Sequence, residues 1–141
     1  MVPVAAGCAA EPVSVTGATP AHAERPACRQ LIAALPERVA GQQQRDVDPA
    51  DALAAAWGDP AIVLRCGVTR PKRLTRTARC DLVNDVGWFS RRRSDGYVFT
   101  TIGRAAYIEL RVPAQYEPAG DALVDVAKAV SAAVPEVKPC V

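Results

Sequence analysis

The sequence predicts a single α+β domain, with an antiparallel meander sheet of four to five strands, two helices packed on one face and disulfide staples. Short alternating runs separated by turn signals fill the middle of the chain, between residues 61 and 112. An amphipathic helical pattern lies on each side of these runs. Four cysteines lie among the elements, an even number typical of proteins in an oxidising compartment. With 141 residues, half of them apolar, the chain has room for one such domain.

Residues 1–25 are expected to form a signal-peptide remnant and a flexible spacer, and residues 26–141 the folded domain, because the first segment has no apolar period and contains Pro, Thr, Ser and Ala. Cys8 ends the run Val4-Ala5-Ala6-Gly7-Cys8, a small-residue pattern at which a bacterial signal peptide is cut and the new N-terminal cysteine is lipidated. We therefore interpret Cys8 as a lipid anchor; the alternative is a free thiol in the tail. Only three residues precede this run, so we expect a basic and apolar upstream segment to be missing.

The first helix is predicted to begin at Pro26, which suits the first turn because proline lacks an N–H. It carries one apolar stripe and ends at Pro36; the stripe consists of Cys28, Leu31, Ile32 and Leu35. Cys28 is therefore expected to face the core.

The segment that follows is less regular. Residues 39–46 are polar and ambiguous, compatible with a short edge strand. A short helix is predicted over residues 52–57, started by Asp48-Pro49-Ala50-Asp51 and ended by Gly58-Asp59-Pro60.

The strongest strand pattern covers residues 61–68, where Ile62, Leu64 and Cys66 alternate with Val63 and Arg65. Further strands are predicted over residues 78–83, 86–92, 97–102 and 106–112. Asn84-Asp85 and Asp95-Gly96 are typical of tight hairpin turns. A last amphipathic helix is predicted over residues 119–134, between Pro118 and Pro135.

The four cysteines Cys28, Cys66, Cys80 and Cys140 allow three disulfide pairings. We predict Cys66–Cys80, because these residues lie on consecutive strands, and Cys28–Cys140, which would clasp the two ends of the domain. The alternatives are buried free thiols or a zinc site. Zinc is disfavoured because there is no Cys-x-x-Cys spacing and the one histidine, His22, lies in the expected spacer.

The positive charge of the chain is concentrated in one segment. Between Arg65 and Arg93 there are nine Arg or Lys and two Asp, although the whole chain has a net charge of only +2. This segment favours binding of anionic lipid or cell-wall polymer, the alternative being an ordinary solvated loop. The candidate binding residues are Arg70, Lys72, Arg73 and Arg76 in the loop, and a pocket bordered by Trp57, Arg65 and Arg104.

An extracytoplasmic enzyme is the remaining hypothesis. Without a histidine in the folded region no Ser/His/Asp set is available, and no glycine-rich phosphate loop is present. A catalytic carboxylate pair would require residues such as Asp59 and Glu109 to converge, although Asp59 before Pro60 is typical of a turn. We expect no catalytic residues, no cofactor, no metal and no nucleic-acid partner.

Several blocks of the chain resemble an actinobacterial family known as domain of unknown function 3515. The residues that carry the resemblance are Ala54-Ala55-Ala56-Trp57-Gly58-Asp59-Pro60-Ala61-Ile62-Val63-Leu64-Arg65-Cys66-Gly67-Val68-Thr69-Arg70-Pro71, Val83-Asn84-Asp85-Val86-Gly87-Trp88-Phe89, Phe99-Thr100-Thr101-Ile102-Gly103-Arg104 and Pro139-Cys140. The resemblance implies a secreted or membrane-tethered envelope protein and supplies no catalytic residues. With the cysteines and the spacer, it favours a non-catalytic envelope protein, membrane-associated through an N-terminal anchor, that binds an envelope partner or ligand.

Overall fold

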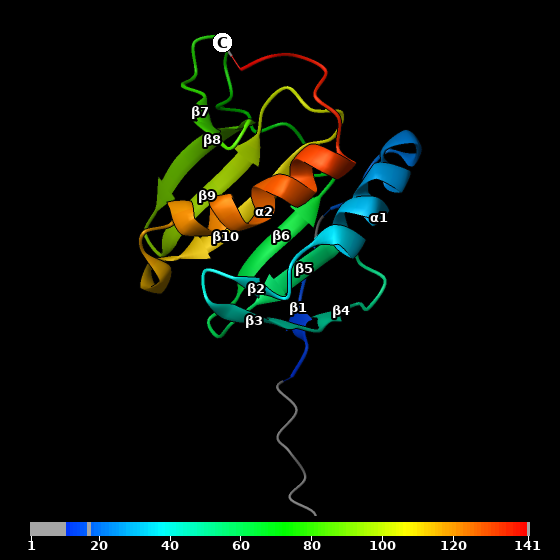
Figure 1. Cartoon of the computed structure of the whole chain (residues 1–141), viewed down its shortest axis with the longest axis vertical. Coiled ribbons are helices and arrows are strands. Elements are labelled where there is room, and N and C mark those ends of the chain that lie inside the picture. Colours follow the sequence, from blue (N-terminus) through cyan, green and yellow to red (C-terminus); the bar gives the residue numbers. More distant parts are fainter. Residues whose placement is uncertain (1–10, 17, 141) are drawn as a thin grey trace, which may run out of the picture.

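A computed structural model describes residues 11–16 and 18–140 (Figure 1). Within these residues, eight strands form the main sheet: β2 (Arg38–Val39), β3 (Gln42–Arg45), β5 (Ala54–Trp57), β6 (Ile62–Cys66), β7 (Asp81–Val83), β8 (Val86–Arg93), β9 (Gly96–Thr101) and β10 (Ile108–Pro113). Their order across the sheet is β2-β3-β5-β6-β10-β9-β8-β7, and every neighbouring pair is antiparallel.

The sheet consists of two four-stranded meanders that meet where β6 pairs with β10. Leu64 of β6 lies opposite Leu110 of β10, and Arg65 lies opposite Glu109. The strand that follows β6 in the chain, β7, lies at the far edge of the sheet. The loop of residues 67–80 therefore has to run from the centre of the sheet to its edge.

Two helices, α1 (Arg25–Ala34) and α2 (Gly120–Ala133), cover one face of the sheet (Figure 1). Pro26 lies in the first turn of α1. The strands alternate, so that one set of side chains packs beneath the helices and the other set points to the opposite face. The fully buried residues of the helix-covered face include Leu31, Trp57, Ile62, Leu64, Trp88, Ile108, Leu110, Val126 and Val130. Two short 3-10 helices, η1 (His22–Glu24) and η2 (Ala114–Tyr116), complete the fold.

The predicted α+β class, the antiparallel sheet and the two covering helices are confirmed. The strand patterns between residues 61 and 112 all correspond to strands, with shorter or shifted ends. Asn84 and Asp85 form the predicted tight turn, with left-handed φ values of 46° and 69°. These elements were predictable because each combines alternation with a turn signal.

The predicted strand number of four to five is too low, and the predicted helix over residues 52–57 is wrong. Ala54–Trp57 form β5, between β3 and β6, and all four residues are buried. At the expected helix start, Asp48 ends a short strand, and the residues after it form a turn in which the Ala52 N–H donates to the Pro49 carbonyl. A six-residue helix is marginal by itself, whereas a central strand pairs on both sides, so tertiary pairing overrides the helix propensity of alanine.

The ambiguous residues 39–46 contain parts of two strands. β2 and β3 form a hairpin around Ala40 and Gly41, whose φ values of 50° and 76° are both left-handed. The Gln-rich sequence of β3 hides the strand, because its side chains show no apolar alternation.

Part of the expected spacer is packed. β1 (Val13–Ser14) pairs in parallel with β4 (Val47–Asp48), and Val15 is buried. The residues from 11 to 16 thus lie against the domain, and the fold extends N-terminally of residue 26. Cys8 lies outside the described residues. None of the helices in the described part of the chain has the length and apolar character needed to span a membrane.

The four cysteines form two disulfides, but the predicted pairing of Cys28 with Cys140 and of Cys66 with Cys80 is wrong. Cys28 is bonded to Cys66, with 5.5 Å between Cα atoms, and Cys80 to Cys140, with 5.9 Å. β6 and β7 are separated by three strands, which places them about 19 Å apart at the usual strand spacing, too far for Cys66 to reach Cys80. Cys66 instead points toward α1, where Cys28 faces the sheet.

We expect non-reducing peptide mapping to recover Cys28 linked to Cys66 and Cys80 linked to Cys140. These bonds close loops of 38 and 60 residues, so in the loop-entropy model each stabilises the fold by about 4 kcal/mol. Cys28→Ala/Cys66→Ala and Cys80→Ala/Cys140→Ala should each lower the free energy of unfolding by an amount of this order, measured by urea denaturation. A peptide containing Cys28 joined to Cys140 would contradict the described topology.

Candidate functional site

The structure does not bring Trp57, Arg65 and Arg104 into one pocket. Trp57 is fully buried under the helices and donates its indole N–H to the Pro36 carbonyl at 3.0 Å. Arg65, which alternates with buried residues of β6, points to the opposite face of the sheet. Arg104 lies in the loop after β9, close to the end of α2. Trp57 is therefore a core residue, and the two arginines have separate surroundings.

A basic cleft lies where the loop of residues 67–80 passes the C-terminal segment. It has a volume of about 470 Å³. Four of the side chains that line it are cationic, and none of the described residues that line it carries a carboxylate. The lining residues are Arg70, Leu74, Thr75, Arg76, Ala78, Cys80, Ile102, Gly103, Arg104, Tyr107, Val137, Lys138 and Pro139.

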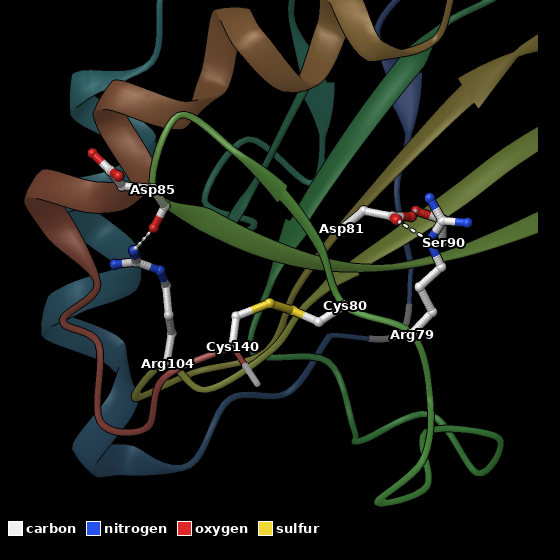
Figure 2. The surroundings of a disulfide bond; sticks show 7 residues. All are labelled: Arg79, Cys80, Asp81, Asp85, Ser90, Arg104 and Cys140. Atoms are coloured by element: carbon white, nitrogen blue, oxygen red, sulfur yellow. Dashed lines mark hydrogen bonds and ion pairs between the residues drawn. A yellow bond between two sulfur atoms is a disulfide. The ribbon is translucent and has the colours of Figure 1, made fainter.

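Arg104 is the buried charge of the basic cleft. It is only 9% exposed, and its guanidinium donates to the Val134 carbonyl at 2.7 Å. It also donates to the Asp85 carbonyl at 3.0 Å (Figure 2). Within the described residues it forms no ion pair with a carboxylate. Two carbonyls accept hydrogen bonds from two of its N–H groups without cancelling its charge, so the inner wall of the cleft stays positive.

The C-terminal segment forms the second wall. The N–H groups of Val137 and Lys138 both donate to the Gly103 carbonyl, at 2.7 and 3.0 Å. Gly103 has a left-handed φ of 76°, and a side chain there would collide with the Lys138 carbonyl. The Cys80–Cys140 bond then ties this segment to the residue that precedes β7 (Figure 2). The hydrogen bonds to Gly103 and the disulfide at Cys140 thus hold Lys138 in the cleft.

The loop that carries Arg70 and Arg76 is anchored at Leu74. This leucine is 8% exposed, and its carbonyl accepts a hydrogen bond from the Arg70 guanidinium at 2.7 Å. Lys72, Arg73 and Arg76 are exposed, as expected of a basic loop. Arg70 and Arg76 turn to the basic cleft, and Arg73 to a separate hollow.

That hollow, which we call the arginine pocket, has a volume of about 500 Å³ and lies on the outer part of β8. It is lined by Arg73, Phe89, Arg91, Arg92 and Arg93. The basic segment seen in the sequence is therefore divided between two hollows, neither of which has an acidic residue in its lining.

Arg65 lines neither of these two hollows, and its charge is paired. Glu109 Oε1 accepts from Arg65 Nη2 and from Arg111 Nε, each at 2.8 Å. Arg65 also donates to the Thr16 carbonyl. Burial raises the pKa of Glu109, but the hydrogen bonds and charges of Arg111 and Arg65 outweigh it, so the pKa lies below its ordinary value of 4.5. Two arginines bind Glu109, so its surroundings do not support a catalytic carboxylate pair with Asp59.

No group of three or more His, Cys, Asp or Glu side chains in the described part of the chain is arranged to hold a metal ion. His22 lies in η1. The chemistry available in both hollows is therefore the binding of anions by guanidinium, ammonium and hydroxyl groups.

In a comparison with protein families, residues 2–139 match the family described as "Protein of unknown function (DUF3515)". Because the match covers nearly the whole chain, the chain belongs to this family. The comparisons with curated proteins and with solved structures gave no match.

The lowered pKa of Glu109 makes this cluster sensitive to acid. A carboxyl whose pKa is lower in the folded than in the unfolded chain adds stability above the unfolded value, and this stability is lost as the pH falls through the folded value. At pH 7 we expect Glu109→Gln to lower the free energy of unfolding by about 1–2 kcal/mol. The difference from wild type should shrink below about pH 4.5, measured by urea denaturation across this range. A difference that does not change with pH would contradict the description of the cluster.

Proposed function

We propose that this member of the DUF3515 family is a non-catalytic cell-envelope protein outside the cytoplasm, and that its basic cleft binds an anionic group of a lipid or cell-wall polymer. The observation that carries the proposal is Arg104, a buried cation with no carboxylate partner among the described residues, in a cleft that also contains Arg70, Arg76 and Lys138. Buried charges in proteins are generally paired. A bound anion would supply the missing negative charge.

The chemistry of the cleft suits phosphate or carboxylate groups. Guanidinium groups donate two hydrogen bonds in a planar fork, and ammonium groups add a point charge. The residues Thr75 and Tyr107 in the lining carry hydroxyl groups that are able to donate further hydrogen bonds. The cleft is open to solvent on the side of the exposed Arg76 and Lys138, so that a group attached to a larger molecule is able to enter.

A location outside the cytoplasm is supported by the two disulfides. Such bonds persist in oxidising compartments and are rare where thiols are kept reduced. Cys8 in its Ala-Ala-Gly context is the proposed point of attachment to the membrane. The segment from residue 9 to residue 12 would then connect the lipid to β1.

Binding to anionic vesicles tests the function of the cleft. Arg76→Gln/Lys138→Gln removes two exposed cations whose side chains form no hydrogen bond within the described residues. Arg29→Gln/Lys128→Gln removes the same charge from the two helices. Near an anionic surface each cation contributes about 1 kcal/mol, so the cleft variant should bind roughly thirtyfold more weakly than wild type at low salt. Wild-type binding should weaken as salt rises. Sedimentation with anionic and with neutral vesicles, and with purified cell-wall polymer, measures these effects.

The matched variant separates the cleft from general charge attraction. Arg29→Gln/Lys128→Gln should retain most of the wild-type binding, since these residues lie outside the cleft. Equal losses in the two variants, or binding that is indifferent to salt, would contradict the proposal. Arg104 is unsuitable for this test, because its hydrogen bonds hold the end of α2 in place.

The proposed attachment requires expression of the chain behind its native upstream sequence. We expect wild type to enter the detergent phase and Cys8→Ala to stay in the aqueous phase or to remain unprocessed, measured by phase partitioning and intact mass. An alanine variant that partitions and is processed like wild type would show that Cys8 carries no lipid.

A further inference from the structure

The outer edge of β8 is only partly covered by its neighbour. β8 spans eight residues, but β7 spans three and pairs only with Val86, Gly87 and Trp88. The residue before β7, Cys80, is fixed by its bond to Cys140. Among residues 11–16 and 18–140, no strand other than β9 pairs with the part of β8 between Phe89 and Arg93.

The unpaired backbone groups of this edge belong to Ser90 and Arg92. The Ile102 N–H donates to the Gly87 carbonyl, so Gly87 directs its backbone groups toward β9. In an antiparallel pair this direction alternates along the strand. Phe89, Arg91 and Arg93 therefore bond to β9, and Ser90 and Arg92 direct two N–H and two C=O groups outward. Such an edge is able to accept one more strand.

The side chains around this edge are basic. Arg91 and Arg93 point to the face opposite the helices, and Arg92 to the helix-covered side, by the alternation of β8. Arg73, from the loop of residues 67–80, joins them and Phe89 in the arginine pocket. The Ser90 hydroxyl donates to Asp81 at 2.8 Å, and Arg79 also pairs with Asp81, so the Asp81 carboxylate is already engaged (Figure 2).

We propose that the β8 edge between Phe89 and Arg93 binds an acidic peptide segment in extended conformation, by strand addition. The free N–H and C=O groups select a polypeptide backbone, and the four arginines select acidic side chains on it. A second copy of this chain does not fit, because antiparallel pairing of two β8 edges would place arginines opposite one another. A polyanion without backbone amides would use the arginines but leave the Ser90 and Arg92 groups unpaired.

Two peptides of about six residues that alternate Glu with Val distinguish strand addition from simple anion binding. One has free amides, and the other carries N-methyl groups on the edge that would face β8, at equal charge. Loss of about two backbone hydrogen bonds should weaken binding of the methylated peptide about tenfold or more, measured by calorimetry. Amide hydrogen exchange at Ser90 and Arg92 should slow when the unmethylated peptide binds. Equal affinity of the two peptides with unchanged exchange would overturn the proposal in favour of simple anion binding.

Variants place the peptide on β8 and separate this proposal from the function of the basic cleft. Arg91→Gln/Arg93→Gln should weaken peptide binding about tenfold or more, whereas Arg25→Gln/Arg29→Gln on α1 and the cleft variant Arg76→Gln/Lys138→Gln should leave it unchanged. A circular dichroism spectrum and an unfolding midpoint equal to those of wild type would show that the β8 variant is folded. Peptide binding that is lost in the cleft variant and kept in the β8 variant would overturn the proposal.

Discussion

The pairing of β6 with β10 is the constraint on which the rest of the structure depends. It joins two antiparallel meanders into one sheet and places Leu64 against Leu110 under the helices. It also separates β6 from the next strand in the chain, so the loop of residues 67–80 has to cross to the far edge. The basic residues of this loop are carried from the centre of the sheet to the C-terminal segment and to β8. The location of both basic hollows is thus a consequence of topology.

Charged side chains are distributed differently on the two faces of the sheet. Under the helices the side chains are almost entirely apolar, and Cys28–Cys66 links α1 directly to β6. On the opposite face Glu109 is held by Arg65 and Arg111, and its low pKa follows from these two partners. Charges near the middle of the sheet are therefore neutralised, whereas Arg91, Arg92 and Arg93 on β8 form no ion pair within the described residues. This difference separates structural arginines from the arginines available to a ligand.

The basic cleft depends on chain segments that are distant in sequence. Arg104 follows β9, and Arg70 and Arg76 precede β7. Lys138 comes from the last residues described, held by the Gly103 carbonyl and by Cys80–Cys140. The disulfide therefore positions one wall of the cleft as well as stabilising the fold. The same bond fixes the chain immediately before β7, next to the part of the β8 edge that is left unpaired.

The sequence by itself determined the class of the fold, the strands between residues 61 and 112 and both covering helices, because alternation, helical period and turn residues are local signals. It also identified Arg70, Arg76 and Arg104, though as parts of different groups. Only the tertiary structure decided that Ala54–Trp57 form a strand, since their backbone hydrogen bonds come from β3 and β6. It likewise decided the disulfide pairing, because strand order, which no local pattern encodes, separates Cys66 from Cys80. Lys138 could not be assigned to the cleft for the same reason: its position depends on contacts made across the whole domain.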